Sequence, residues 1–451
     1  MNERKISQLR TYIISHKYQA ASILIIVSFL GSFVYGYLDQ YSLNDPNWNY
    51  PENAQELTVK NAAEWASDWF IRTVRSDGSY RYIYYLDRDT YSSSYNYLRH
   101  WGSSYSMIYY YEFNPYPKLL QTVRKTIDWG LKYFTTMEND KNIGYFFYQY
   151  SSSSGGPALA LMAMTKYREL TNDPRYDNYI TKLANFLLWM QEPSGKIRSM
   201  YITNGIPGGE DNPFYPSESL LGLTLVYKLT GEAKYLTALE KAYKYYRNRD
   251  NFDYLASANT PFIPWSTSAF SELYLLTGNY SYADFAFEMI DHRLKSQVTN
   301  TNYYDQFGHS LLGCISKSVA VSSTLEGLGD CYAAAVEAND SQRMNDYEYR
   351  MRIGMEWVLT LQMRYAECEA MNLTHPERAF GGFRHSFEYS DNMTMRNDYT
   401  QHTISALTKY LKYFPASIIN ATEFRVPINP NSANSERNTN YIDSTISAST
   451  N

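Results

Sequence analysis

Three short segments of the chain are nearly identical to one another. LTNDPRY, LTGEAKY and LTGNYSY occupy residues 170–176, 229–235 and 276–282. Each follows an apolar run with helical spacing and precedes another such run. In each copy a Gly or Asn can adopt the left-handed conformation that ends a helix, and a Tyr four residues later begins the packing of the next helix. The repeat therefore predicts an array of helical hairpins.

The apolar spacing extends this array along most of the chain. Alternate segments are rich in Gly, Ala and Ser with few charges, which suits helices packed on all sides, whereas the segments between them carry charge on one face. The pattern predicts an all-α (α/α)6 toroid over residues 55–427, with a small β element in the extended segment 78–86. The expected helices are approximately 55–75, 96–112, 116–137, 156–170, 174–192, 216–230, 233–249, 263–277, 280–296, 317–338, 342–366 and 397–413.

The N-terminal region has the pattern of a membrane anchor. Residues 20–38 carry no charge and are about long enough to cross a bilayer, while residues 1–19 contain four basic side chains that favour the cytoplasmic side. We therefore expect a single-pass protein with a cytoplasmic N-terminus and the helical domain outside the cell or in a lumen. A cleaved signal peptide is the alternative. Residues 39–54 are expected to form a polar linker, and 428–451 a disordered tail.

Composition excludes some classes of function. With 41 Lys and Arg against 46 Asp and Glu, the chain lacks the basic excess of a nucleic-acid-binding surface. The 47 Tyr and 8 Trp residues indicate either a compositional bias or a cleft that stacks against sugars. Three cysteines form no disulfide framework, although a Cys314–Cys331 bridge is conceivable. Zinc-binding motifs are absent, so we expect no metal or other cofactor. Five Asn-x-Ser/Thr triplets are candidate glycan acceptors.

The polar residues near the starts of the inner helices are the candidate functional residues. In a ring of this kind, the loops that lead into the inner helices line one concave cleft, which is the default position for a site. These residues are Arg99, His100, Trp101, Gly155, Gly156, Glu210, Asp211, Tyr215, Trp265, Glu326, Arg384, His385, Arg396, Asp398, Tyr399 and His402.

The last of these clusters surrounds the start of the twelfth helix. Tyr399 and His402 are three residues apart and share a helix face. A tyrosine near Arg396 can have a lowered pKa and act as a base, because a cation favours the phenolate. Two structural roles are alternatives: Asp398 can cap the helix, and His402 can be a hydrogen-bonded core residue.

This region resembles the C-terminal domain of D-glucuronyl C5-epimerases. In that family an Arg-His-Phe element precedes R-W-D-Y-H-T-T-H-I-N-Q-L, and a Tyr-Pro element precedes an L-x-G-L-Y-x-L helix. The matching residues here are Arg384, His385, Phe387, Arg396, Asp398, Tyr399, Ile404 and Leu407, with Tyr215 and Pro216 for the second element. The chain departs from the family in having Phe214 in place of Glu and His402 one position away, and the family's two motifs lie closer together than they do here.

The resemblance implies a sugar polymer as substrate and proton transfer at C5 of a uronic acid. Together with the N-terminal pattern, it predicts a membrane-anchored, exported epimerase. The candidate proton carriers are Tyr215 and Tyr399, with Glu218, Glu210 or Asp211 as assistants, and His402 and Glu326 complete the candidate catalytic residues. The candidate residues for substrate binding are Arg99, His100, Trp101, Trp265, Arg384, His385 and Arg396. An arginine fork matches the geometry of a carboxylate.

Two other functions remain open from the sequence. A glycoside hydrolase on the same toroid needs two carboxylates, ~6.5–9.5 Å apart in an inverting enzyme. Glu210 or Asp211 with Glu326 would supply them. A surface protein that binds glycans through its aromatic side chains needs no catalytic pair.

Overall fold

The computed structural model describes residues 48–305, 309–315, 317–387 and 393–415. The expected cytoplasmic segment 1–19, membrane anchor 20–38 and tail 428–451 lie outside these residues. Within the described ranges, no helix is both long and apolar enough to cross a membrane. The described end of the expected linker packs on the helical domain, since the rings of Trp48 and Tyr50 lie 6.1 and 5.3 Å from that of Phe380.

Each of the twelve expected helical segments contains a long helix, but the segment 116–137 ends in a strand, β3 (Phe134–Thr136), and the helix expected over 342–366 ends at Leu359. Within the described residues the long helices are α2 (Val59–Thr73), α3 (Tyr97–Phe113), α4 (Pro117–Gly130), α5 (Gly155–Thr171), α6 (Asp177–Met190), α7 (Phe214–Thr230), α8 (Ala233–Arg247), α9 (Ile263–Thr277), α10 (Tyr280–Leu294), α11 (Ser318–Glu337), α12 (Ser341–Leu359) and α14 (Asn397–Tyr413). A short helix, α13 (Tyr365–Ala370), was not expected.

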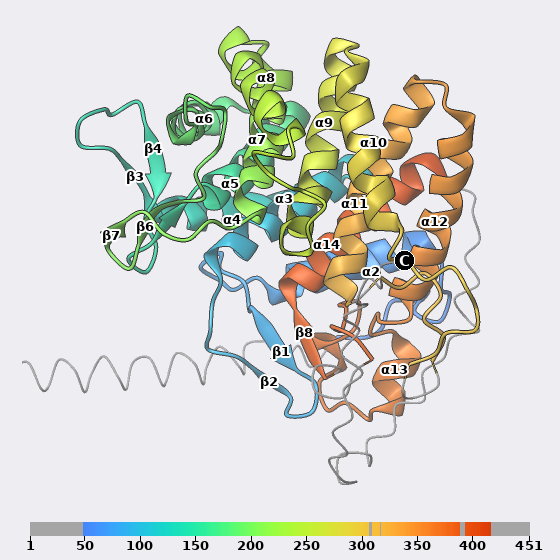
Figure 1. Cartoon of the computed structure of the whole chain (residues 1–451). Coiled ribbons are helices and arrows are strands. Elements are labelled where there is room, and N and C mark those ends of the chain that lie inside the picture. Colours follow the sequence, from blue (N-terminus) through green and yellow to red (C-terminus); the bar gives the residue numbers. More distant parts are fainter. Residues whose placement is uncertain (1–47, 306–308, 316, 388–392, 416–451) are drawn as a thin grey trace, which may run out of the picture.

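The long helices form two concentric layers (Figure 1). The inner helices α3, α5, α7, α9, α11 and α14 pack each on the next, and α14 packs on α3 to close the ring. Each outer helix packs mainly on one inner helix: α4 on α3, α6 on α5, α8 on α7, α10 on α9, α12 on α11 and α2 on α14. The (α/α)6 toroid is therefore confirmed.

The repeated segments form the turns of three hairpins. Asn172, Gly231 and Gly278 are the C-caps of α5, α7 and α9, and each is left-handed, with φ of 58°, 67° and 71°. Their N–H groups donate to the carbonyl four residues back. The tyrosines that follow are buried: Tyr235 and Tyr282 lie in α8 and α10, and Tyr176 immediately precedes α6. Both roles predicted for the repeat are confirmed.

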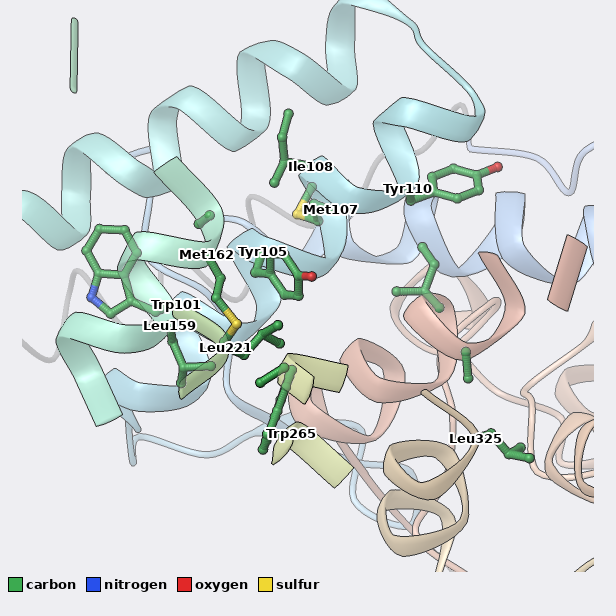
Figure 2. Packing of buried hydrophobic residues seen from close by; sticks show 14 of the residues in the cluster. Trp101, Tyr105, Met107, Ile108, Tyr110, Leu159, Met162, Leu221, Trp265 and Leu325 are labelled. Atoms are coloured by element: carbon green, nitrogen blue, oxygen red, sulfur yellow. The ribbon is translucent and has the colours of Figure 1, made fainter. Parts of the chain in front are cut away.

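Small residues bring the inner helices close together. A Cβ at Gly222 of α7 would lie 3.0 Å from the carbonyl oxygen of Ala158 in α5. Helix α3 is buried on several sides, and Figure 2 shows Trp101 and Met107 on different faces of it within the cluster. The three cysteines are buried and none forms a disulfide, so the conceivable Cys314–Cys331 bridge is not formed.

Short strands precede the starts of inner helices. Strands β1 (Ile83–Tyr85), β2 (Thr90–Tyr91) and β8 (Thr394–Arg396) form an antiparallel sheet in the order β2-β1-β8, so the extended segment 78–86 does contribute a β element. The other strands are β3 (Phe134–Thr136) paired with β4 (Gly144–Phe146), and β5 (Ser152–Ser153), β6 (Met200–Thr203) and β7 (Ile206–Pro207) in a second three-stranded sheet.

The two ends of the ring differ. The connections from an inner to the next outer helix are short, while those from an outer to the next inner helix carry the strands (Figure 1). At the short-turn end, three ion pairs join side chains near the axis: Lys166–Glu112 at 2.9 Å, Lys228–Glu272 at 2.7 Å and Lys409–Asp330 at 2.6 Å. The long loops surround the opposite end, where the inner helices start.

Candidate functional site

A cleft of about 360 Å³ lies where the inner helices begin. This volume falls within the ~300–1,000 Å³ typical of ligand sites. The helices α3, α5, α7, α9, α11 and α14 all contribute to its wall. Its lining residues include Leu98, Arg99, Leu159, Asn212, Tyr215, Glu218, Pro264, Trp265, Arg293, Ala320, Ser323, Asp398, Gln401 and His402. Below, "the cleft" means this space.

His402 enters the cleft from α14 and is held by Glu326 of α11. Its Nδ1 lies 2.5 Å from Glu326 Oε2, and Glu326 is only 3% exposed. The carboxylate therefore fixes the orientation of the imidazole. The other ring nitrogen, Nε2, takes no part in this bond. The indole of Trp265 lies beside it, with ring centroids 5.6 Å apart. His402 is thus placed as an acid–base group with a buried orienting carboxylate.

Glu218 is a buried carboxyl group in the wall of the same cleft. It comes from the first turns of α7, and its Oε2 has no hydrogen-bond partner among the described residues. Burial raises its pKa to about 8, opposed in part by the charge of Arg99. A Cβ at Gly155 of α5 would lie 2.5 Å from this oxygen, so the missing side chain leaves room for it. At pH 7 Glu218 is therefore mostly the neutral acid.

Asp398 is held between two arginines. Arg99 Nε lies 2.8 Å from its Oδ2, and Arg396 Nε lies 2.5 Å from its Oδ1. Arg99 also donates to the hydroxyl of Tyr82. Asp398 does not cap α14 as the sequence suggested, because the N-cap is Arg396 and Asp398 lies within the first turn. The carboxylate neutralises much of the positive charge of Arg99 and Arg396.

Arg293 contrasts with Arg99 and Arg396, which are both paired with Asp398. It enters the cleft wall from α10, and its Nε donates to Thr324 Oγ1 at 3.3 Å. Among the described residues it has no ion pair, and burial alone lowers its pKa. A guanidinium without a counter-ion in a cleft is suited to bind an anionic group of a ligand.

The structure corrects the expected placement of His100 and Trp101. Both are fully buried, and neither lines the cleft. The His100 ring lies 2.7 Å from the Tyr95 hydroxyl and 2.9 Å from the carbonyl oxygen of Thr126, and burial lowers its pKa to about 3. Trp101 stacks on Phe146 with centroids 5.2 Å apart. On α3 these two side chains face the outer layer and the loops, because only Arg99 and Leu98 occupy the cleft face of that turn.

The residues that carry the epimerase resemblance lie mostly outside the cleft lining. The Tyr399 ring, 4% exposed, lies between His385 at 4.8 Å and the guanidinium of Arg396 at 4.5 Å. Arg384 is 2% exposed, and its backbone N–H donates to Leu361. Of the candidate residues near the starts of the inner helices, the cleft wall therefore contains Tyr215 and Trp265 but not Tyr399 or His100.

The expected acidic partners in the loop before α7 are also outside the cleft. Glu210 is exposed, and Asp211 is exposed and pairs with Lys196 at 2.8 Å. Their loop follows β7 and points its carboxylates to solvent, so neither faces Glu326. Glu218, named only as an assistant from the sequence, takes the acidic position instead. The sequence feature that could have identified Glu218 is that it is the lone carboxyl group in the otherwise uncharged first turns of an inner helix.

Metal binding gains no support from the described part of the chain, where no three His, Cys, Asp or Glu residues gather as a metal site would require.

Similar solved structures share the toroid. An inactive variant of a family 76 α-1,6-mannanase from Salegentibacter sp. HEL1_6, in complex with α-1,6-mannotriose, is 12% identical, with a TM-score of 0.55 over 78% of this chain and 98% of that chain. A D-mannose isomerase is 12% identical, with a TM-score of 0.57 over 81% and 100%. An unsaturated glucuronyl hydrolase specific for heparin is 11% identical, with a TM-score of 0.55 over 79% and 98%.

The chain has the six-hairpin glycosidase-like fold. Identities this low show the fold alone. No protein-family model matches the sequence, and no curated protein matches it. The finer resemblance to D-glucuronyl C5-epimerases is therefore unconfirmed.

Proposed function

We propose that this six-hairpin protein is a sugar epimerase that moves a proton at a carbon of an acidic sugar unit. The observation that carries the proposal is the pairing, in one cleft, of a carboxylate-oriented imidazole with a neutral carboxylic acid. His402 with Glu326 supplies the first, and Glu218 supplies the second. Epimerisation needs such a pair, because one group removes a proton and another returns one to the opposite face.

The roles follow from the charges. His402 takes the proton, and Glu326 stabilises the imidazolium that results. Glu218, protonated at pH 7, donates to the carbanion-like intermediate. Arg293 pairs with the carboxylate of the sugar and stabilises the charge that develops beside the reacting carbon. Trp265 and Tyr215 offer aromatic faces to the sugar ring.

The comparisons support this class of chemistry without deciding it. A D-mannose isomerase uses the same fold, as does a hydrolase whose name specifies a glucuronyl unit. Since one fold hosts several reactions, the argument rests on the cleft residues.

The test is solvent exchange. The protein is incubated in heavy water with a polymer that contains glucuronic acid, and the product is examined by NMR and by size. We expect deuterium at C5 with no shortening of the chains. His402→Ala and Glu218→Gln should each lower the exchange rate by a factor of ~10²–10⁴, the usual contribution of general acid–base groups.

The matched control is Glu210→Gln, which changes a carboxyl group that is exposed and outside the cleft. It should exchange like the wild type. Equal losses in Glu210→Gln and Glu218→Gln would contradict the assigned site.

A glycoside hydrolase is the second candidate. Two carboxyl groups, Glu218 and Asp398, line the cleft, and a neutral Glu218 is suited to protonate a leaving group. Asp398, however, is occupied by Arg99 and Arg396 and is poorly placed to activate water. Shortened chains without deuterium incorporation would favour hydrolysis. Binding without either reaction would favour a glycan-binding surface protein.

We also propose, on the sequence of residues 1–38 alone, that the protein is anchored in a membrane with its helical domain on the non-cytoplasmic side. A glycan substrate outside the cytoplasm would then be within reach.

A further inference from the structure

A column of polar contacts joins α11 to α14, the two helices that form the Glu326–His402 pair. On α11 the contacting residues are spaced by four, so they lie on one face of that helix. The contacts are Ser322–Thr403 at 2.8 Å, Glu326–His402 at 2.5 Å and Asp330–Lys409 at 2.6 Å. The last contact lies one helical turn beyond Glu326, toward the short-turn end of the ring.

Lys409 bonds to Glu326 as well as to Asp330. Its Nζ donates to the backbone carbonyl oxygen of Glu326 at 3.1 Å and pairs with Asp330 Oδ2 at 2.6 Å. Lys409 is only 6% exposed, and a buried ammonium group needs such partners because an unpaired buried charge is costly. One side chain of α14 therefore contacts the residue that orients His402 and the residue one turn beyond it.

A glycine in α11 makes room for the stem of Lys409. A Cβ at Gly329 would lie 2.9 Å from Cβ and 3.2 Å from Cδ of Lys409. A larger residue at this position would force the stem, and with it α14, away from α11. Glycine is unfavourable inside a helix, so its presence beside Asp330 is explained by this close approach.

Lys166, at the same end of the ring, is similar in burial but different in its partners. It is 7% exposed and pairs with Glu112 at 2.9 Å and Glu169 at 3.2 Å. These partners belong to α3 and α5, so neither lies on α11 or α14. Lys166 therefore repeats the burial and ion pairing of Lys409 without the bond to Glu326.

We propose that Lys409 is a positioning residue for His402. By bonding to Asp330 and to the carbonyl oxygen of Glu326, it fixes α11 against α14 and keeps the Glu326 carboxylate within hydrogen-bond reach of the imidazole. Lys409 acts from a small cavity at the short-turn end, outside the lining of the cleft. The inference rests on the proposed function, in which His402 takes the proton.

The experiment compares Lys409→Met with Lys166→Met in the full chain. Each variant removes one buried ammonium group and leaves its carboxylate partners, so both should lower the melting temperature. The first readout is the rate of deuterium incorporation into the polymer. We expect Lys409→Met to lower this rate by a factor of ~10–10², because a small misplacement of a catalytic group slows the reaction strongly. Lys166→Met should exchange like the wild type.

The second readout is the NMR signal of the His402 imidazole in protein labelled with nitrogen-15 at histidine, assigned with His402→Ala. Its position reports the hydrogen bond between Nδ1 and Glu326. We expect the signal to move in Lys409→Met and to keep its wild-type position in Lys166→Met. A lysine with a merely structural role would lower the melting temperature and leave this signal unchanged.

Asp330→Asn keeps the test decisive if Lys409→Met does not fold. This variant keeps the size of the side chain and one acceptor oxygen, at a position that is 27% exposed. It should cause the same two changes at smaller size, because Lys409 keeps its bond to Glu326. An unchanged His402 signal in the folded variants, or equal changes in Lys409→Met and Lys166→Met, would overturn the positioning role.

Failure of the proposed function is distinguishable from failure of this inference. The NMR signal needs no turnover, so a protein that incorporates no deuterium can still show that Lys409 positions His402. Conversely, deuterium incorporation at the wild-type rate in Lys409→Met, with an unmoved His402 signal, would retain the epimerase and reject the positioning role.

Discussion

Glu218 shows how strongly burial changes the chemistry of one residue. The carboxyl group of a glutamate in water has a pKa of about 4.5, and in this protein burial raises that of Glu218 to about 8. The charge of Arg99 opposes this rise in pKa. Arg99 forms no ion pair with Glu218, because its guanidinium is already paired with Asp398. The same glutamate on an outer helix would be ionised at pH 7.

Substitution of Glu218 should therefore have a pH-dependent effect on stability. The unfolded chain ionises this group near pH 4.5 and the folded protein only near pH 8, so the wild type loses stability as pH rises between these values. Glu218→Gln cannot ionise and should be more stable than the wild type above pH 8, by a few kcal/mol at most. At pH 4 the difference should vanish. Chemical denaturation at several pH values measures it, and a pH-independent difference would argue against the raised pKa.

The repeated threonine and its C-cap are the second determinant at this scale. Thr171, Thr230 and Thr277 each donate to the carbonyl four residues back at 2.7–2.9 Å, and each accepts from the N–H two residues on at 3.2 or 3.3 Å. The threonine thus bonds across the helix end where the next residue turns left-handed. This explains why LT recurs before Gly or Asn.

We expect Gly231→Ala to destabilise the protein by ~1–2 kcal/mol, because its φ of 67° is unfavourable for a residue with a Cβ. Nothing crowds this position, so the effect isolates backbone conformation. Asn172→Gly at the equivalent turn should be neutral or slightly stabilising. Thermal unfolding of both variants tests this. A Gly231→Ala variant that melts at the same temperature as Asn172→Gly would contradict the prediction.

At the scale of elements, the inner helices depend on small residues at their contacts. Helices α5 and α7 approach closely at Ala158 and Gly222, which explains why Gly is placed in the middle of a helix despite its low helical propensity. The charged faces of the outer helices need no such contacts.

This contrast gives a paired prediction. Gly222→Ala places a Cβ 3.0 Å from a carbonyl oxygen and should destabilise the protein by about 1 kcal/mol or more, since the backbone of α5 must shift. Gly156→Ala, in α5, places a Cβ no nearer than 3.8 Å to another atom, so this variant should gain up to ~1 kcal/mol of stability from helical propensity. Denaturant titration distinguishes them. A stabilised Gly222→Ala would show that the helices are not held at this distance.

At the scale of the whole molecule, asymmetry between the two ends of the ring positions the site. Short turns and ion pairs such as Lys409–Asp330 occupy one end, and the long loops with their strands occupy the other. The cleft lies at the second end, beside the starts of the inner helices.

The proposed anchor is tested on the full chain. We expect it to sediment with membranes and to resist extraction at alkaline pH, because ~20 apolar residues insert stably in a bilayer. Protease added on the non-cytoplasmic side should degrade the helical domain and spare residues 1–19. A variant lacking residues 1–38 should lose membrane association. Full-length protein in the soluble fraction would contradict the anchor.

The amino-acid sequence by itself determined the helices, their turns and the closed ring. The reason is that these features depend on local terms: apolar spacing, a left-handed residue after each helix, and small side chains where helices meet. The left-handed conformation of three helix-ending residues was predicted from their neighbours along the chain. The structure confirms it for Asn172, Gly231 and Gly278. The same sequence pattern predicted where the inner helices start, and these starts located the region of the cleft.

Only the tertiary structure decided which side chains of that region face the cleft and which charges pair. His100 and Arg99 are adjacent in sequence, yet one is buried against Thr126 and the other lines the cleft, since a rotation of ~100° per residue separates neighbours on a helix. Glu326 contacts His402 through a hydrogen bond, and Asp398 forms an ion pair with Arg99. The partners in each pair are far apart in the sequence, so no local pattern predicts that they pair. The neutral state of Glu218 depends on the packing around it, so it exists only once the ring has closed.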